Sequence, residues 1–153
     1  MLGWLDHKVP PPLVTAIIAA LMWLGHRWLG NDVAGGWLFF LGLAFCVAGV
    51  GVAVTGFRTM MAARTSSNPI QIDLATHLVS SGIYSRTRNP MYLGMVMVLI
   101  GVECVFANTW LLLGPIAFVI FIRWFQIAPE ERMMQKKFGA EYNAYRQRVR
   151  RWI

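Results

Sequence analysis

The sequence predicts an all-α integral membrane protein, a single domain over residues 1–153, with about four transmembrane helices, a cytoplasmic loop and a C-terminal amphipathic helix. Composition is the first observation behind this prediction, because 57% of the residues are hydrophobic and only 14% are charged. A soluble domain of this size cannot hide so many apolar side chains, so lipid must cover part of them. The second observation is that basic residues lie between and after the apolar segments, the pattern that orients membrane proteins. This placement disfavours nucleic-acid binding as the explanation of the net charge of +7.

The first two spans are expected at about 10–29 and 33–57. The stretch from Val9 to Gly25 is uncharged and begins with three consecutive prolines. It lacks a clear small-residue cleavage site before its bulky end, so we interpret it as a spanning helix rather than a signal peptide. The uncharged run from Val33 to Phe57 is long enough to cross a bilayer with some tilt.

A stripe of small residues runs along the second expected span. Its glycines recur every seven residues, at Gly35, Gly42, Gly49 and Gly56, with Cys46 and Ala53 on the same face. Such a stripe lets a second helix approach closely. We expect it to pack within the chain, and a dimerisation face is the alternative.

A polar loop, expected at 58–90, carries four arginines, Arg58, Arg64, Arg86 and Arg88. Beyond the loop, Glu103 is the only charge between Met91 and Ile122. One helix over that stretch would be roughly 48 Å long, whereas the hydrocarbon core of a bilayer is about 30 Å thick. We therefore expect two spans, at about 90–107 and 109–127, joined by a tight turn, with the second loosened at Gly114-Pro115.

The tail, 129–153, is expected to be a separate amphipathic segment. Its apolar residues follow helical spacing: Met134, Phe138, Tyr142, Tyr145, Val149 and Trp152. Basic residues fill the other faces, and Gly139 is expected to divide the helix. Such a segment either lies on the membrane surface or covers the loop.

The distribution of lysine and arginine predicts the orientation. With four spans, the N-terminus, the loop and the tail share one side of the membrane. If Arg123 is taken as the end of the fourth helix on that side, 13 of the 14 basic residues lie there and only Arg27 lies on the opposite side. The positive-inside rule then places the N-terminus, the loop and the tail in the cytoplasm.

Two polar groups should meet on that side. Asn89-Pro90 is typical of a helix start, with Asn as the cap and Pro in the first turn, and the positive end of that helix beside Arg88 favours an anion. Pro129 followed by Glu130 and Glu131 is also typical of a helix start. The alternative is that both glutamates only satisfy the helix dipole and pair with nearby arginines.

Other candidate residues leave two interpretations open. Tyr84 and Tyr92 are either aromatic-belt residues or π faces for a cation such as a sulfonium. His77 is more often a loop residue without a special role than a base or a ligand. The histidines and cysteines lack ligand-like spacing, so we expect no metal site.

These residues form a composite pattern. The run LVSSGIYSRTRNPMYLG at 78–94 is followed, beyond the last two spans, by Glu130-Glu131, Phe138-Gly139 and a YxxYxxxV motif that begins at Tyr142. The pattern resembles the isoprenylcysteine carboxyl methyltransferase-like membrane enzymes, to which phospholipid N-methyltransferases are related. The resemblance covers residues 76–153.

The resemblance implies a cytoplasm-facing pocket for S-adenosylmethionine, which leaves as S-adenosylhomocysteine, closed by the tail. By the same resemblance the expected cofactor-binding residues are Thr76, His77, Leu78, Val79, Tyr84, Asn89, Pro90, Met91, Tyr92, Glu130 and Glu131. The residues expected to serve catalysis are Arg88, Glu130 and Arg123.

Two positions depart from the family pattern. Asn89 stands where many members have His, a familiar bacterial variant, and a bacterial inner membrane is therefore the expected location. Gln126 stands where the eukaryotic enzymes have an arginine thought to hold the substrate carboxylate. Arg123, one turn earlier, is a candidate replacement, and a prenylated-cysteine carboxylate is in question as the substrate.

The expected function is therefore methyl transfer to a small lipophilic or membrane-embedded acceptor. Because the sequence offers only His77 and the glutamates as bases, it favours an acceptor that is already nucleophilic over a protonated amine. The alternatives are a phospholipid N-methyltransferase and a non-catalytic membrane protein that keeps the fold. A transporter is disfavoured because it would carry ionisable residues in the middle of its spans.

Overall fold

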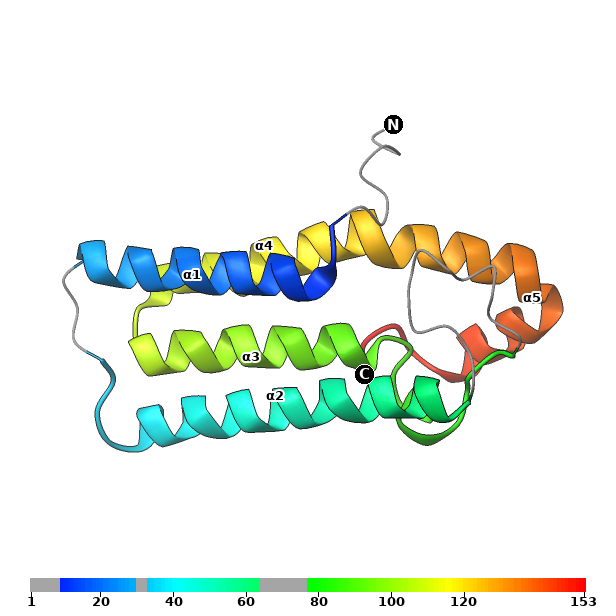
Figure 1. Cartoon of the computed structure of the whole chain (residues 1–153), viewed down its shortest axis with the longest axis horizontal. Coiled ribbons are helices and arrows are strands. Elements are labelled where there is room, and N and C mark those ends of the chain that lie inside the picture. The colour runs from blue at the N-terminus through cyan, green and yellow to red at the C-terminus, as the bar shows by residue number, and fades with distance from the viewer. Residues whose placement is uncertain (1–8, 30–32, 64–76) are drawn as a thin grey trace.

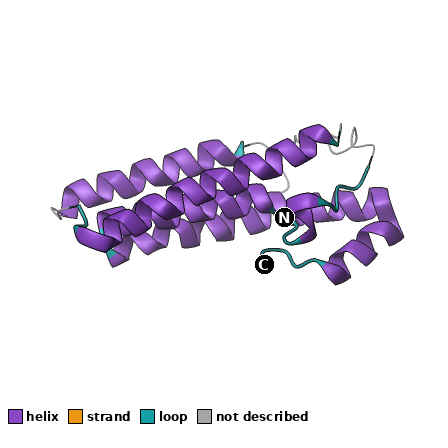
Figure 2. Cartoon of the chain, turned by 90° about the horizontal axis from the view of Figure 1, so that it is seen from below, coloured by secondary structure: helices purple, strands orange, loops and turns teal. Residues whose placement is uncertain are grey.

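The computed structural model describes residues 9–29, 33–63 and 77–153, and all regular elements in these ranges are helical (Figures 1 and 2). The longer helices are α1 (Pro11–Leu29), α2 (Gly36–Ala62), α3 (Pro90–Phe106), α4 (Leu113–Ile122) and α5 (Ala128–Arg148). Three short helical turns lie between them, η2 (Gly82–Ser85), η3 (Thr109–Leu112) and η4 (Arg123–Ile127). The prediction of an all-α protein is confirmed.

Apolar length agrees with a membrane protein. Three described helices are long and apolar enough to cross a bilayer, namely α1, α2 and the continuous helix Thr109–Arg148. The fourth expected span, α3, is a shorter apolar helix of 17 residues. Large apolar side chains of α1 and α2 point outward, as the surface of a lipid-embedded helix does; examples are Leu21, Trp28, Trp37, Phe40 and Val47.

The closest helix contact joins α2 to α3, which run side by side in Figure 1. A Cβ atom added at Gly49 would lie 2.6 Å from the carbonyl oxygen of Gly94, and one at Gly42 would lie 2.7 Å from that of Gly101. Only glycine allows the two backbones to approach this closely. The glycine stripe therefore packs within the chain, as expected, although Gly35 lies outside the contact.

Helix α3 is central, because α1 and α4 also pack against it. The main core of the chain forms there, around Tyr92 and Leu99 of α3 and Phe118 and Ile122 of α4. Leu99, Phe118 and Ile122 have no exposed surface.

The predicted hairpin after α3 is confirmed. Ala107 ends the helix in the left-handed conformation, with φ 49°, and its N–H donates to the carbonyl of Glu103 at 2.8 Å. The Asn108 side chain accepts from the N–H of Trp110 at 3.1 Å, which begins the next helical turn.

The tail, in contrast, does not begin as a separate helix. One helix continues from Thr109 to Arg148, so Pro129 lies inside it and the predicted helix start there is wrong. In an α-helix a proline removes one hydrogen bond and its ring clashes with the carbonyl four residues earlier. Here the turn before Pro129, Arg123–Ile127, is a π-helix, which breaks the regular four-residue register at that point.

Gly139 divides α5, as the sequence predicts. Its φ of 49° and ψ of −113° are not helical, and the chain beyond it turns back toward the start of α3 (Figure 1, red). There Tyr142, Tyr145 and Val149 form a second small core with Leu78. The last part of the tail therefore covers the loop.

The α2–α3 contact predicts a large difference between two Gly→Ala substitutions in one helix. Gly49→Ala forces a methyl group against a backbone carbonyl, whereas a Cβ at Gly51 meets nothing within 4 Å. We expect Gly49→Ala to lower stability by about 1–3 kcal/mol and Gly51→Ala to be neutral or slightly stabilising. Thermal unfolding in detergent, followed by circular dichroism, measures both, and equal melting temperatures would contradict the contact.

Candidate functional site

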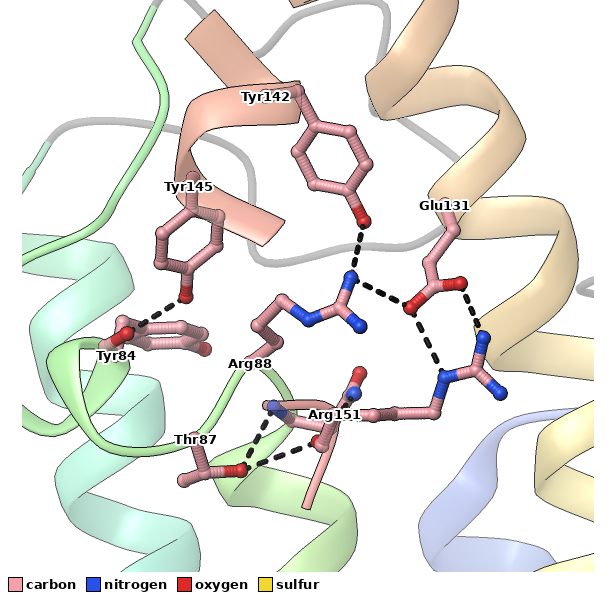
Figure 3. A network of polar contacts seen from close by, with 8 residues as sticks. Tyr84, Thr87, Arg88, Glu131, Tyr142, Tyr145 and Arg151 are labelled. Carbon is pink, nitrogen blue, oxygen red and sulfur yellow. Dashed lines mark hydrogen bonds and ion pairs between the residues drawn. The ribbon is translucent and has the colours of Figure 1, made fainter. Parts of the chain in front are cut away.

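Three segments that are distant in sequence meet beside the first residue of α3. They are the loop that contains η2 and ends at Asn89, the first turn of α5, and the C-terminal residues 149–152 (Figure 3). Both polar groups singled out in the sequence lie here.

Pro90 is the first residue of α3 and Asn89 occupies the N-cap position, as the sequence predicts. However, the Asn89 side chain does not cap the helix. Its Nδ2 donates instead to the backbone carbonyl of Arg151 at 2.9 Å, and Thr87 Oγ1 donates to the same oxygen at 3.4 Å. The predicted capping role is thus wrong, because the amide is used to hold the end of the chain.

The two adjacent glutamates have different partners. Glu131 pairs with Arg88, whose Nη1 lies 2.9 Å from Oε1, and with Arg151, whose Nε and Nη2 lie 3.1 and 2.5 Å from its two oxygens. Arg88 Nη1 also donates to the hydroxyl of Tyr142 at 3.3 Å (Figure 3). The sequence left open that the two glutamates pair with nearby arginines, and Glu131 does so.

Glu130 contacts Tyr92 instead. The Tyr92 hydroxyl donates to Oε1 of Glu130. Burial raises the pKa of Glu130 to about 7, an effect that the hydrogen bond from Tyr92 opposes and the charge of Glu131 reinforces. Near neutral pH this carboxyl can therefore hold or release a proton.

The tyrosines of the site are buried within the chain. Tyr84 and Tyr92 are only 6% and 5% exposed, which does not fit residues of an aromatic belt facing lipid headgroups. Tyr145 donates from its hydroxyl to the carbonyl of Tyr84 at 2.7 Å. Burial raises the pKa of both Tyr84 and Tyr145 well above the usual range of a phenol, so these rings stay neutral.

Gln126 and Arg123 differ in burial. Gln126 is fully buried in the π turn, and its Nε2 donates to the carbonyl of Val9, just before α1, at 3.0 Å. Arg123 is exposed. In this structure Arg123 therefore does not occupy the place of an arginine at position 126.

The remaining expected cofactor residues are spread over the loop and α3. Val79 and Pro90 are buried, Leu78 and Met91 are half-buried, and His77 is exposed. Thr76 lies outside the described residues. Within 9–29, 33–63 and 77–153, no group of His, Cys, Asp and Glu side chains is arranged to hold a metal ion.

Sequence reasoning missed Thr87 and Arg151. Arg151 was only one of many basic residues of an amphipathic tail, which was expected either to lie on the membrane surface or to cover the loop. Its pairing with Glu131 depends on the return of the chain at Gly139, and the sequence carries no local signal of which arginine returns to the glutamate.

Comparison with known proteins identifies the family of the chain. The sequence model of the family described as phospholipid methyltransferase matches residues 37–141. The chain is 30% identical to protein-S-isoprenylcysteine O-methyltransferase B of Arabidopsis thaliana over 118 residues, which are 74% of this chain and 57% of that protein. It is 38% identical to protein-S-isoprenylcysteine O-methyltransferase of Saccharomyces cerevisiae over 78 residues, 47% of this chain and 30% of the yeast protein.

A shorter relative is an uncharacterized protein of Haemophilus influenzae, 43% identical over 63 residues, which are 41% of this chain and all of that protein. No solved structure matches the chain. The chain spans about half the length of the plant relative and less of the yeast one. The names of the family and of the plant and yeast relatives indicate methyl transfer. The apolar helices agree with a membrane protein. Because the family model matches well over half of the sequence, the chain belongs to the phospholipid methyltransferase family.

Proposed function

We propose that the chain transfers a methyl group from S-adenosylmethionine to a lipophilic or membrane-embedded acceptor at the cytoplasmic face of a bacterial inner membrane. The observation that carries the proposal is the meeting of Glu130 and Tyr92 beside the first turn of α3. Four spans, with the loop and the tail on the cytoplasmic side, are part of the proposal.

The residues at this place fit the cofactor. Glu130 supplies a carboxylate for the ammonium group or the ribose hydroxyls, and the neutral rings of Tyr84 and Tyr92 supply π faces that attract a sulfonium. The start of α3 is a positive helix end. The cluster of Arg88, Arg151 and Glu131 has two positive charges and one negative, so one positive charge remains to attract a carboxylate.

The cofactor would supply an electrophilic methyl group on its sulfonium. The chain's own contribution is to align the acceptor with that group and to exclude water. The burial of Tyr84, Tyr92 and Tyr145 supports a dry site. A lipophilic acceptor fits because the site adjoins apolar helices, and we propose that it enters sideways from the bilayer.

The second candidate acceptor is a phospholipid amine, and Glu130 is the observation that favours it. An ammonium group must lose a proton before it can accept a methyl group. A carboxyl with a pKa of about 7, next to Tyr92, is a suitable proton acceptor. Incubation with methyl-labelled cofactor and vesicles of phosphatidylethanolamine, or with a prenylated cysteine, distinguishes the two acceptors by which lipid becomes labelled.

Calorimetric binding of S-adenosylmethionine and S-adenosylhomocysteine to the protein in nanodiscs tests the proposal. We expect both to bind, and Glu130→Gln to weaken binding at least about tenfold because a charged hydrogen-bond acceptor is lost. Glu141→Gln is the matched control, since Glu141 is an exposed glutamate in the part of α5 beyond Gly139. No binding to a folded wild-type protein, or equal affinity in both variants, would refute the placement of the cofactor.

The pKa of Glu130 also predicts a pH dependence. Since its pKa in the folded protein is raised to about 7, the unliganded carboxyl is largely protonated at pH 6 and largely ionised at pH 8. A positively charged ligand favours the ionised form, so the affinity for S-adenosylmethionine should rise between these pH values and binding should release protons below pH 7. Calorimetry in buffers of different ionisation enthalpy measures the release.

Glu130→Gln removes this titration, so the difference between the two pH profiles isolates Glu130 from the titration of the ligand itself. The stability of the unliganded protein has the opposite pH dependence to the ligand affinity: it falls as the pH rises. A raised pKa means that the contribution of Glu130 to stability is present below its usual pKa and is lost as the pH rises through about 7. Parallel binding profiles of the wild type and the variant would show that Glu130 does not face the ligand's charge.

A further inference from the structure

We infer that Glu131 and Arg151 are positioning residues: their ion pair holds the C-terminal residues against the segment 87–92, and the binding site keeps its shape only while they are paired. This inference rests on the proposed function. It separates the roles of the two adjacent glutamates, because Glu130 faces Tyr92 and Glu131 faces the arginines.

The backbone of the tail forms one wall of the site. The carbonyl of Arg151 accepts from the side chains of Asn89, at 2.9 Å, and Thr87, at 3.4 Å. The carbonyl of Arg150 accepts from the N–H of Arg88 at 3.1 Å. Three consecutive loop residues, immediately before Pro90, are therefore bonded to two consecutive tail residues.

The Arg151 side chain fixes the position of that wall. Its guanidinium binds both oxygens of Glu131, a two-point geometry that a lysine cannot reproduce. The side chains of Glu131 and Arg88 are only 14% and 11% exposed, so their charges are poorly solvated. Without Glu131 the two guanidinium groups would repel each other, and without Arg151 only Arg88 would balance the carboxylate.

The rest of the tail has anchors of its own. Val149 packs into the small core with Tyr142 and Tyr145, and Trp152 packs against the main core around α3. Loss of the Arg151 side chain should therefore leave the tail attached while it loosens the contacts between 150–151 and 87–89. This separates positioning from folding and makes the inference testable.

The difference between Glu130 and Glu131 follows from helix geometry. Successive residues of a helix point about 100° apart. The π turn at Arg123–Ile127 sets the rotation of α5 just before the pair. With that rotation, one carboxylate meets Tyr92 of α3 and the next meets Arg88 and Arg151.

The test compares Arg151→Ala, Arg151→Lys and Arg150→Ala in the full chain in nanodiscs. Arg150 is the matched control because its side chain is exposed, and the substitution keeps the backbone carbonyl that Arg88 uses. Affinity for S-adenosylhomocysteine is measured by calorimetry well below the melting temperature of each variant. We expect Arg150→Ala to bind like the wild type, Arg151→Ala to bind at least about tenfold more weakly, and Arg151→Lys to lie between them.

A charge exchange tests the pairing itself. Glu131→Arg alone places three arginines together, whereas Glu131→Arg with Arg151→Glu restores the original net charge of the cluster. We expect the double variant to recover part of the affinity that Glu131→Arg loses. If Arg151→Ala does not fold, the double variant still tests whether the two side chains must be paired. No recovery, or wild-type affinity in Arg151→Ala, would overturn the inference.

Hydrogen exchange of the loop amides provides a readout that does not depend on the cofactor. Exchange at 87–89 should be faster in Arg151→Ala than in the wild type and unchanged in Arg150→Ala. If the wild type binds no cofactor, the proposed function fails, and this measurement still shows whether Arg151 positions the loop. If the wild type binds and neither affinity nor exchange changes in Arg151→Ala, only the positioning role fails.

Discussion

The close contact between α2 and α3 is the constraint on which the rest of the structure depends. It extends from Gly42 against Gly101, through Gly49 against Gly94, to Gly56, where an added Cβ would lie 3.0 Å from Pro90. Its last point is therefore the first residue of α3, where the candidate site lies. In a bilayer the hydrophobic effect does not drive helices together, so tight packing of small residues must do so. The same contact that joins two helices also places the start of α3.

The second determinant is the continuous helix from the last span into the tail. The π turn at Arg123–Ile127 is buried at Gln126, which binds the carbonyl of Val9. This links the beginning of α1 to the turn just before the two glutamates. The Gln126 amide thus serves the architecture of the chain in this structure, whereas the Arg123 side chain is exposed.

The chemistry of the proposed site follows from burial. Phenols with raised pKa values remain neutral, and a half-buried carboxyl with a pKa of about 7 exchanges a proton near neutral pH. A neutral aromatic surface suits a sulfonium, and a titratable carboxyl suits an amine acceptor. The sequence favoured an acceptor that is already nucleophilic because it offered only His77 and the glutamates as bases. What the structure adds is a pKa of about 7 for Glu130, one of the bases that the sequence offered, so the amine acceptor becomes a stronger alternative.

The sequence by itself determined the all-helical class, the hairpin after α3, the glycine contact and the break at Gly139, because apolar length, small-residue spacing and turn residues act locally. Tertiary structure decided which partners the polar side chains take. Asn89 has the sequence of a cap but binds the Arg151 carbonyl, and Pro129 has the sequence of a helix start but lies in a continuous helix. Local preferences of this kind amount to about 1 kcal/mol. The tertiary contacts of the tail and the π turn outweigh these local preferences. No local sequence pattern reveals which residue of the tail comes to lie beside Asn89 or Glu131.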